Sequence, residues 1–147
     1  KLQPSEEKKT GYERVAEYDG FYYESSDATV EDGLEEHTEL DDEYYDIANY
    51  YSDKTVAENN ARADKLMRQL RRFSVEHRGR GVDFNDIKTK KYCIYYDYGS
   101  DELDSTYTVC VRAFGAIYFD SEETANAAID EFHDELIWYF TEYKDSL

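Results

Sequence analysis

The densest group of side chains that could do chemistry in this sequence is a run of carboxylates with no lysine or arginine among them. Two carboxylates can act as acid and base in hydrolysis. Such pairs occur almost anywhere in a chain with 35 acidic residues, so their presence is no evidence for catalysis. A folded array of carboxylates can instead occupy a basic channel in which another protein holds phosphates. The run consists of Asp27, Glu31, Asp32, Glu35, Glu36, Glu39, Asp41, Asp42, Glu43 and Asp46.

Tyrosines accompany the carboxylates. Tyr22 and Tyr23 precede the run, and Tyr44 and Tyr45 lie near its end. Flat rings can stack where the bases of a nucleic acid would stack, so the segment predicts a partner-binding surface that mimics nucleic acid. The alternative interpretation is a solvated acidic face that keeps a small protein soluble.

Basic residues gather in a separate window. Of the 17 lysines and arginines, ten lie between Arg62 and Lys91, together with four acidic residues. On a helix, Lys65, Arg68 and Arg72 would share one face and form a candidate basic patch for nucleic acid. Because the net charge of the chain is −18, we expect neutralisation within the fold or plain solvation of this patch, and no direct binding of nucleic acid.

The other reactive residue types predict no catalytic site. Cys93 and Cys110 lack metal-ligand spacing, the three histidines are scattered, and the acidic residues around Gly99 lack the spacing of a calcium loop. The chain has no phosphate loop, nucleophile elbow or dinucleotide motif. We therefore expect no enzyme, no metal and no cofactor.

Hydrophobic periodicity predicts an α+β fold, with a mostly antiparallel sheet of short strands and two long helices packed on it. Apolar residues recur at helical spacing over residues 53–77, after the capping pair Ser52-Asp53. A second long helix is predicted from Ser121 to about residue 143. Short strands are predicted at residues 21–23, 47–51, 91–98, 105–114 and 116–119.

Two details depend on this arrangement. Trp138 lies off the apolar stripe of the second helix, which makes it a candidate anchor for a partner; the alternative is that the acidic N-terminal segment covers it. In the hairpin, pairing Tyr98 with Ser105 would place Cys93 opposite Cys110, both as thiols.

Two stretches of the sequence are similar. Residues 50–57 match residues 118–125, and each has the order strand, helix cap, amphipathic helix. This similarity indicates two β-β-α halves, residues 19–78 and 91–147, each too small to bury its own face alone. The alternative is chance similarity between two capped helix starts.

The length of 147 residues predicts a single α+β domain over residues 19–147, preceded by a flexible N-terminal arm over residues 1–18. No apolar run is long enough to span a membrane, and nothing in the sequence has the pattern of a signal peptide. An anionic chain also avoids anionic lipid surfaces, so we expect no membrane association.

The sequence pieces together resemble a family of small proteins encoded in phages, prophages and other mobile elements of Gram-positive bacteria. The family usually carries Gly where this chain has Ala48, and an acidic pair where it has Thr55-Val56. The resemblance implies a mobile-element accessory protein and transfers no catalytic residues. It covers roughly residues 44–147, with matching pieces at residues 47–51, 70–73, 83–86, 91–97 and 114–123.

We therefore expect a non-enzymatic, acidic mobile-element protein that binds and inhibits a host nucleic-acid-handling defence protein, such as a CRISPR effector or a restriction system, by nucleic-acid mimicry. The expected partner is a host protein with a basic nucleic-acid-binding channel, in the cytoplasm of a bacterial host. The alternative is a phage accessory protein–protein interaction module without mimicry. The sequence leaves the oligomeric state open.

Overall fold

The computed structural model describes residues 8–147, and this part of the chain contains four helices and two antiparallel sheets of two strands each. The predicted α+β class is confirmed. The chain divides into two compact units. Unit 1 comprises the chain up to Asp64 together with Tyr143–Leu147, and unit 2 comprises Lys65–Glu142.

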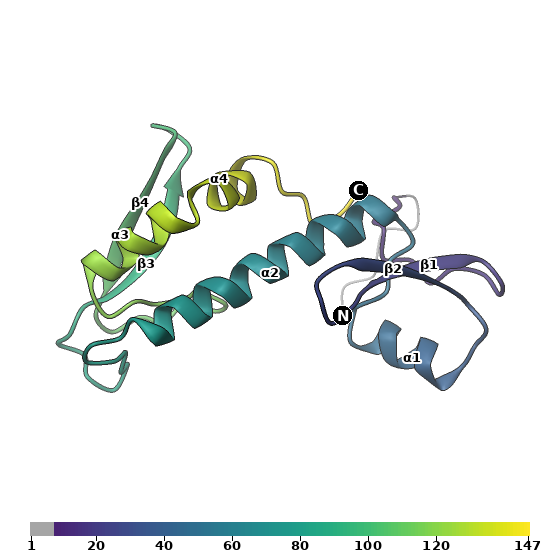
Figure 1. Ribbon diagram of the computed structural model, residues 1–147, viewed down its shortest axis with the longest axis horizontal. Coiled ribbons are helices and arrows are strands. Elements are labelled where there is room, and N and C mark those ends of the chain that lie inside the picture. Colours follow the sequence, from purple (N-terminus) through teal and green to yellow (C-terminus); the bar gives the residue numbers. More distant parts are fainter. Residues whose placement is uncertain (1–7) are drawn as a thin grey trace. The chain divides into compact units, whose positions relative to one another are not determined.

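Unit 1 contains a hairpin of β1 (Gly20–Glu24) and β2 (Val30–Leu34), then α1 (Glu39–Asp46) and the beginning of α2 (Lys54–Glu76) (Figure 1). Aromatic rings supply much of its core, since the buried rings of Phe21 and Tyr50 are stacked with centroids 4.2 Å apart. Offset stacking of this kind adds to the free energy gained by burying the rings.

The flexible arm predicted for residues 1–18 is wrong for the part that the structure describes, and residues 1–7 lie outside the described residues. Gly11 is buried, and its carbonyl oxygen accepts a hydrogen bond from the Ser52 amide at 2.8 Å. The ring of Tyr12 packs on Tyr51 with centroids 5.0 Å apart, and its hydroxyl donates to the Asp145 carbonyl at 2.8 Å. The segment therefore belongs to the fold of unit 1.

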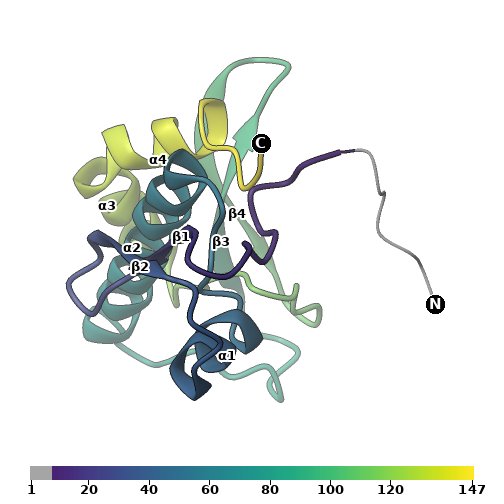
Figure 2. The same cartoon turned by 90° about the vertical axis from the view of Figure 1, so that its right-hand side faces the viewer.

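Unit 2 contains the rest of α2, a hairpin of β3 (Lys91–Asp97) and β4 (Glu102–Thr108), and the helices α3 (Glu122–Glu131) and α4 (His133–Thr141). The last two helices follow one another beside α2 and the hairpin (Figures 1 and 2). Their apolar faces share one core with α2, formed by Leu66, Leu70, Phe73, Phe119, Ala125, Ala128, Ile129 and Leu136.

The second long helix predicted from Ser121 is present but is interrupted. Ser121 caps α3, with its hydroxyl oxygen accepting from the Thr124 amide, and the helix ends at Phe132, which has φ −105° and ψ 22°. The ring of Phe132 meets Phe73 edge to face at 5.8 Å. The apolar spacing continues unchanged through the interruption, which is why periodicity did not predict it.

The predicted hairpin register is wrong. Cys93 lies opposite Thr106, whereas Cys110 lies beyond the end of β4, and both cysteines are free thiols. The two strands pair four positions away from the predicted register, because β4 starts earlier than expected. An even shift keeps side-chain alternation, so residues predicted to share a face still share it.

Two predicted strands are reduced to single bridges. Residues 47–51 pair through Tyr51, which exchanges two backbone hydrogen bonds of 2.8 Å with Tyr22. The rest of that segment turns, because Ala48 has a left-handed φ of 57° and its amide donates to the Tyr45 carbonyl at the end of α1. Residues 116–119 likewise pair through Phe119.

One local arrangement occurs in both units. In unit 2, Phe119 exchanges two backbone hydrogen bonds with Tyr92, of 2.7 and 2.8 Å, as Tyr51 does with Tyr22 in unit 1. Two residues after each bridge, a side chain caps the following helix. Asp53 accepts from the amide three residues on at 3.0 Å, as Ser121 does at 3.1 Å. Tyr51 and Phe119, like Asp53 and Ser121, are separated by the same offset of 68 positions as the two similar sequence stretches, whereas their bridge partners Tyr22 and Tyr92 are 70 positions apart.

Candidate functional site

The acidic run divides into buried and exposed carboxylates. Glu35 has no exposed surface and Asp41 is 6% exposed, whereas the other eight members are exposed. The hypothesis that all ten carboxylates bind a partner is therefore wrong for these two residues, because a partner cannot reach a buried side chain.

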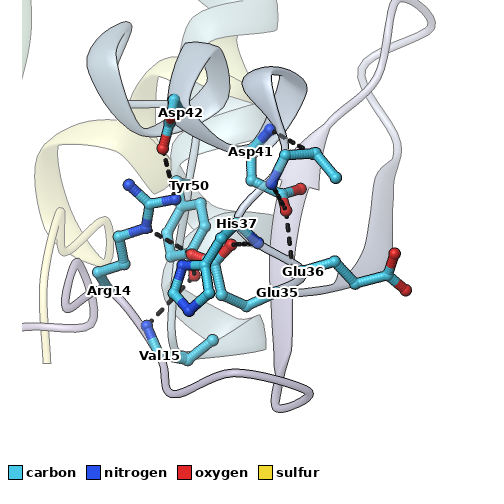
Figure 3. Close-up of polar contacts among 9 residues, drawn as sticks. Arg14, Val15, Glu35, Glu36, His37, Asp41, Asp42 and Tyr50 are labelled. Atoms are coloured by element: carbon cyan, nitrogen blue, oxygen red, sulfur yellow. Dashed lines mark hydrogen bonds and ion pairs between the residues drawn. The ribbon is translucent and has the colours of Figure 1, made fainter.

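Glu35 is held by an internal network (Figure 3). Its Oε1 accepts from the Arg14 Nε at 2.5 Å and from the Tyr50 hydroxyl at 3.1 Å, and its Oε2 accepts from the His37 amide at 3.2 Å. The hydrogen bond from the Arg14 guanidinium holds the pKa of Glu35 below its usual value, although burial opposes this. A buried carboxylate with three donors is a structural anion.

Arg14 links this network to α1. Its Nη2 lies 2.7 Å from Asp42 Oδ1, and its guanidinium carbon lies 5.3 Å from the centre of the Tyr45 ring. Sequence reasoning assigned Arg14 to a mobile arm and missed this role. The available signal was a single arginine placed shortly before a strand in a segment otherwise rich in carboxylates.

Asp41 has a local structural role at the start of α1. Its Oδ2 accepts from the amides of Glu36 at 2.9 Å and Thr38 at 3.1 Å, and its own amide donates to the Thr38 hydroxyl at 3.2 Å. Burial raises the pKa of Asp41, but the two amide donors outweigh burial and the pKa is lowered. This reciprocal capping box explains why a helix starts inside so acidic a segment.

Among the exposed carboxylates, three have partners within unit 1. Asp42 pairs with Arg14. Asp27 accepts hydrogen bonds from Ser25 and Thr29 in the β1–β2 turn, which lower its pKa to about 2. Glu31 accepts from the Tyr23 hydroxyl at 3.0 Å and raises the pKa of that tyrosine to about 12.

Five carboxylates of the run have side chains without a hydrogen-bond or ion-pair partner within residues 8–147. Three of them lie on α1, where Glu39, Glu43 and Asp46 share one exposed stripe with Asp42 at spacings of three, four and seven residues. Figure 3 shows the side chain of Glu36 directed away from the Arg14–Glu35 network. The five residues are Asp32, Glu36, Glu39, Glu43 and Asp46.

The aromatic candidates differ in accessibility. Tyr45 is 45% exposed, while Tyr44 is half-buried with its ring stacked on Tyr23 at 4.4 Å. Trp138 is 8% exposed, so the hypothesis that it anchors a partner is wrong for this structure. One exposed tyrosine therefore adjoins the α1 stripe, and the predicted tryptophan anchor is buried.

The residues of the predicted basic patch lie on a helix, as expected. Lys65, Arg68 and Arg72 are all exposed on α2 within unit 2. Within the part of the chain that the structure describes, no group of three or more His, Cys, Asp or Glu side chains could hold a metal ion. In the same residues, no helix is both long and apolar enough to cross a membrane.

Three comparisons with known proteins add no assignment. No protein-family model, curated protein or solved structure matches the chain.

Proposed function

We propose that the chain is a non-enzymatic mobile-element protein that binds and inhibits a host nucleic-acid-handling protein, of CRISPR effector or restriction type, by placing the α1 stripe in its basic channel. The stripe consists of Glu39, Asp42, Glu43 and Asp46, with Tyr45 beside it. The resemblance to mobile-element proteins adds the biological setting, the cytoplasm of a bacterial host.

The spacing of the stripe is the observation that supports this proposal best. At about 1.5 Å of rise per residue, residues 39–46 place four carboxylates along about 10.5 Å, or about 3.5 Å between successive carboxylates on average, and Asp42 among them is also ion-paired with Arg14. One strand of B-DNA carries one charge about every 3.4 Å along its axis. A channel that binds this charge density on a nucleic acid strand also fits it on α1.

The charges of α1 also disfavour the isolated helix. Like charges three and four residues apart repel by roughly 0.2–0.5 kcal/mol per pair. Asp46 lies at the carboxyl end, where the helix dipole disfavours an anion, and the last turn contains no basic residue. Lysines and arginines of a partner would relieve both effects, so binding should be strongest at low salt.

The alternative function is a protein–protein interaction module without mimicry. The observation that favours it is the exposure of apolar side chains outside the acidic run, including Phe114 and Tyr98, which is 67% exposed. In that interpretation the carboxylates only keep the protein soluble.

A capture experiment separates the two functions. The protein is passed through lysate of the bacterial host at low and high salt, with and without nuclease, against a variant with Glu36→Gln, Glu39→Gln, Glu43→Gln and Asp46→Asn. Mimicry predicts that the wild type retains a nucleic-acid-handling protein at low salt and that the variant retains at least tenfold less. Nuclease treatment should not release the partner, because the contact is directly between proteins.

The matched control removes four negative charges elsewhere. Glu122, Glu123, Asp130 and Glu131 are exposed carboxylates of α3 in unit 2. Their replacement by Gln or Asn changes the net charge equally, so it should leave capture unchanged. If both variants lose the partner to the same degree, only net charge matters and the α1 stripe is not the binding surface.

A further inference from the structure

A groove in unit 2 follows one side of α2, facing residues 112–118. At one end it contains a cavity of about 280 Å³, lined by apolar side chains that include Leu66, Leu70, Phe119 and Phe140. The polar side-chain groups in this lining are the Cys93 thiol and the Tyr139 hydroxyl.

The same groove becomes cationic further along α2. Arg71 and Arg112 line a neighbouring cavity of about 500 Å³, and both also line a third one of about 580 Å³ with Arg78. Ala116 and Ile117 line all three cavities, so the apolar and cationic parts are contiguous.

The arginines of this groove are not neutralised within the residues that the structure describes. Arg71 is exposed and has no ion-pair partner there. The guanidinium carbon of Arg112 lies 5.3 Å from the centre of the Phe84 ring, a cation–π contact that leaves its positive charge uncompensated. The carboxylate of Asp83, which also lines the third cavity, accepts from the Asn85 amide at 2.9 Å.

We propose that this groove binds an amphiphilic anion of the acyl carboxylate class, with its tail in the apolar cavity and its carboxylate between Arg71 and Arg112. A hydrocarbon tail needs no hydrogen bonds, whereas a peptide main chain in the same cavity would leave its amide groups unsatisfied. At about 30 Å³ for each water-sized group, 280 Å³ holds on the order of nine methylene-sized groups. This proposal does not depend on the mimicry function.

Phe114 provides an independent indication of an apolar ligand. It lines the apolar cavity, yet the residue is 109% exposed at the tip of a turn. The next residue is Gly115 with φ 77°, a left-handed conformation that glycine adopts without strain. A tail that enters beside Phe114 would remove a fully hydrated phenyl ring from water.

Three ligands with a ten-carbon chain, counting the carboxyl carbon of decanoate, test the proposal by isothermal titration calorimetry below their micelle concentrations: decanoate, decanol and decyltrimethylammonium. The net charge of −18 favours the ammonium ligand at long range. Tighter binding of decanoate can therefore come only from a local cationic site. We expect decanoate to bind with a 1:1 stoichiometry and about tenfold more tightly than decanol.

Variants of the groove test which residues bind the carboxylate of the ligand and which bind its hydrocarbon tail. The double variant Arg71→Gln with Arg112→Gln should weaken the binding of decanoate about tenfold and leave the binding of decanol unchanged. The control double variant, Lys65→Gln with Arg72→Gln, removes the same charge outside the groove and should change the binding of neither ligand. Ala116→Trp, at an exposed lining position, should weaken all three ligands by narrowing the cavity. Thermal melting of each variant verifies that it folds.

Three results would overturn the proposal. The first is saturable decanoate binding that none of these variants changes, or no saturable binding at all. The second is tighter binding of decyltrimethylammonium than of decanoate. The third is tighter binding of a labelled acidic peptide, one leucine followed by four glutamates, which would assign the groove to a protein partner instead.

Discussion

Replacing Glu35 by glutamine is the sharpest test of the network that holds unit 1 together. Glutamine preserves the shape of the side chain but removes the charge and turns one acceptor into a donor. Oε1 accepts from Arg14 and Tyr50, and Oε2 accepts from the His37 amide. Whichever way the amide is turned, at least one donor will face another donor.

The magnitude follows from these contacts. A hydrogen bond to a charged group contributes about 1.5–3 kcal/mol, and a buried donor left without an acceptor costs about 1–3 kcal/mol. Arg14 is partly exposed and keeps its ion pair with Asp42, which reduces the loss. We therefore expect Glu35→Gln to lower the free energy of unfolding by about 2–3 kcal/mol and the melting temperature by about 5–10 °C.

The neighbouring residue gives the control. Glu36 is exposed, and its carboxylate has no partner within residues 8–147. Glu36→Gln should change the free energy of unfolding by no more than about 0.5 kcal/mol. Urea denaturation followed by circular dichroism measures both variants. Equal losses in the two would refute the structural role assigned to Glu35.

The pH dependence gives a second test with a definite sign. The pKa of Glu35 is lowered in the folded protein, mainly by Arg14. A carboxyl group of this kind stabilises the fold above its unfolded pKa of about 4.3, and this contribution is lost as pH falls through the folded pKa. The difference between wild type and Glu35→Gln should therefore be full at pH 7 and shrink below about pH 4.3. If the difference in free energy of unfolding between the two proteins stays constant with pH, the charge of Glu35 does not stabilise the fold.

Three other predictions follow from single residues. Ala48→Gly should raise the free energy of unfolding by about 1 kcal/mol, because Ala48 has a left-handed φ of 57° that an L side chain disfavours; an unchanged urea midpoint would contradict this. Asp53→Ala and Ser121→Ala should each cost about 1 kcal/mol, since each removes an acceptor at the start of a helix; a large difference between them would show that the two caps are not equivalent. Cys110 should react with Ellman's reagent faster than Cys93, because burial raises the pKa of the Cys93 thiol, and the reverse order would contradict the burial of Cys93.

The elements predicted correctly are those fixed by local physics. The apolar stripe and the capping residue predicted residues 53–77, and α2 runs from Lys54 to Glu76. Ser121 caps a helix as predicted. In each region a short sequence contains both the helical period and the signal for the helix start, so no distant contact is needed to choose the structure there.

The wrong predictions concern features that are set by contacts between residues distant in the sequence. A four-residue turn after Asp97 sets the β3–β4 register, and nothing in the strands themselves distinguishes registers shifted by an even number of residues. The burial of Trp138 also depends on contacts formed only in the fold. Ala48 adopts a left-handed φ of 57°, and this conformation replaces part of a predicted strand with a turn at the end of α1.

The acidic composition also includes two classes of carboxylate, buried and exposed, which composition does not distinguish. Glu35, Asp41 and Asp120 are buried and accept hydrogen bonds from backbone amides or from Arg14, whereas Glu36 next to Glu35 is exposed. The same residue type therefore holds the fold at one position and faces solvent at the next. For Glu35 and Asp120 the sequence alone could not show this, because Arg14 and the amides of residues 79–81 lie 21 or more positions away; the donors to Asp41 are the nearby amides of Glu36 and Thr38.

The same local arrangement of strand, cap and helix occurs in both units, although the two units expose different surfaces. The bridges and caps constrain a few positions, whereas the exposed positions around them tolerate change with little effect on folding. Unit 1 contains 20 acidic and seven basic residues, against 15 and ten in unit 2. Unit 1 thus presents the carboxylates of α1, and unit 2 presents the Arg71–Arg112 groove. Because these surfaces lie in different units, variants of one should leave ligand binding by the other unchanged, and each proposal can fail alone.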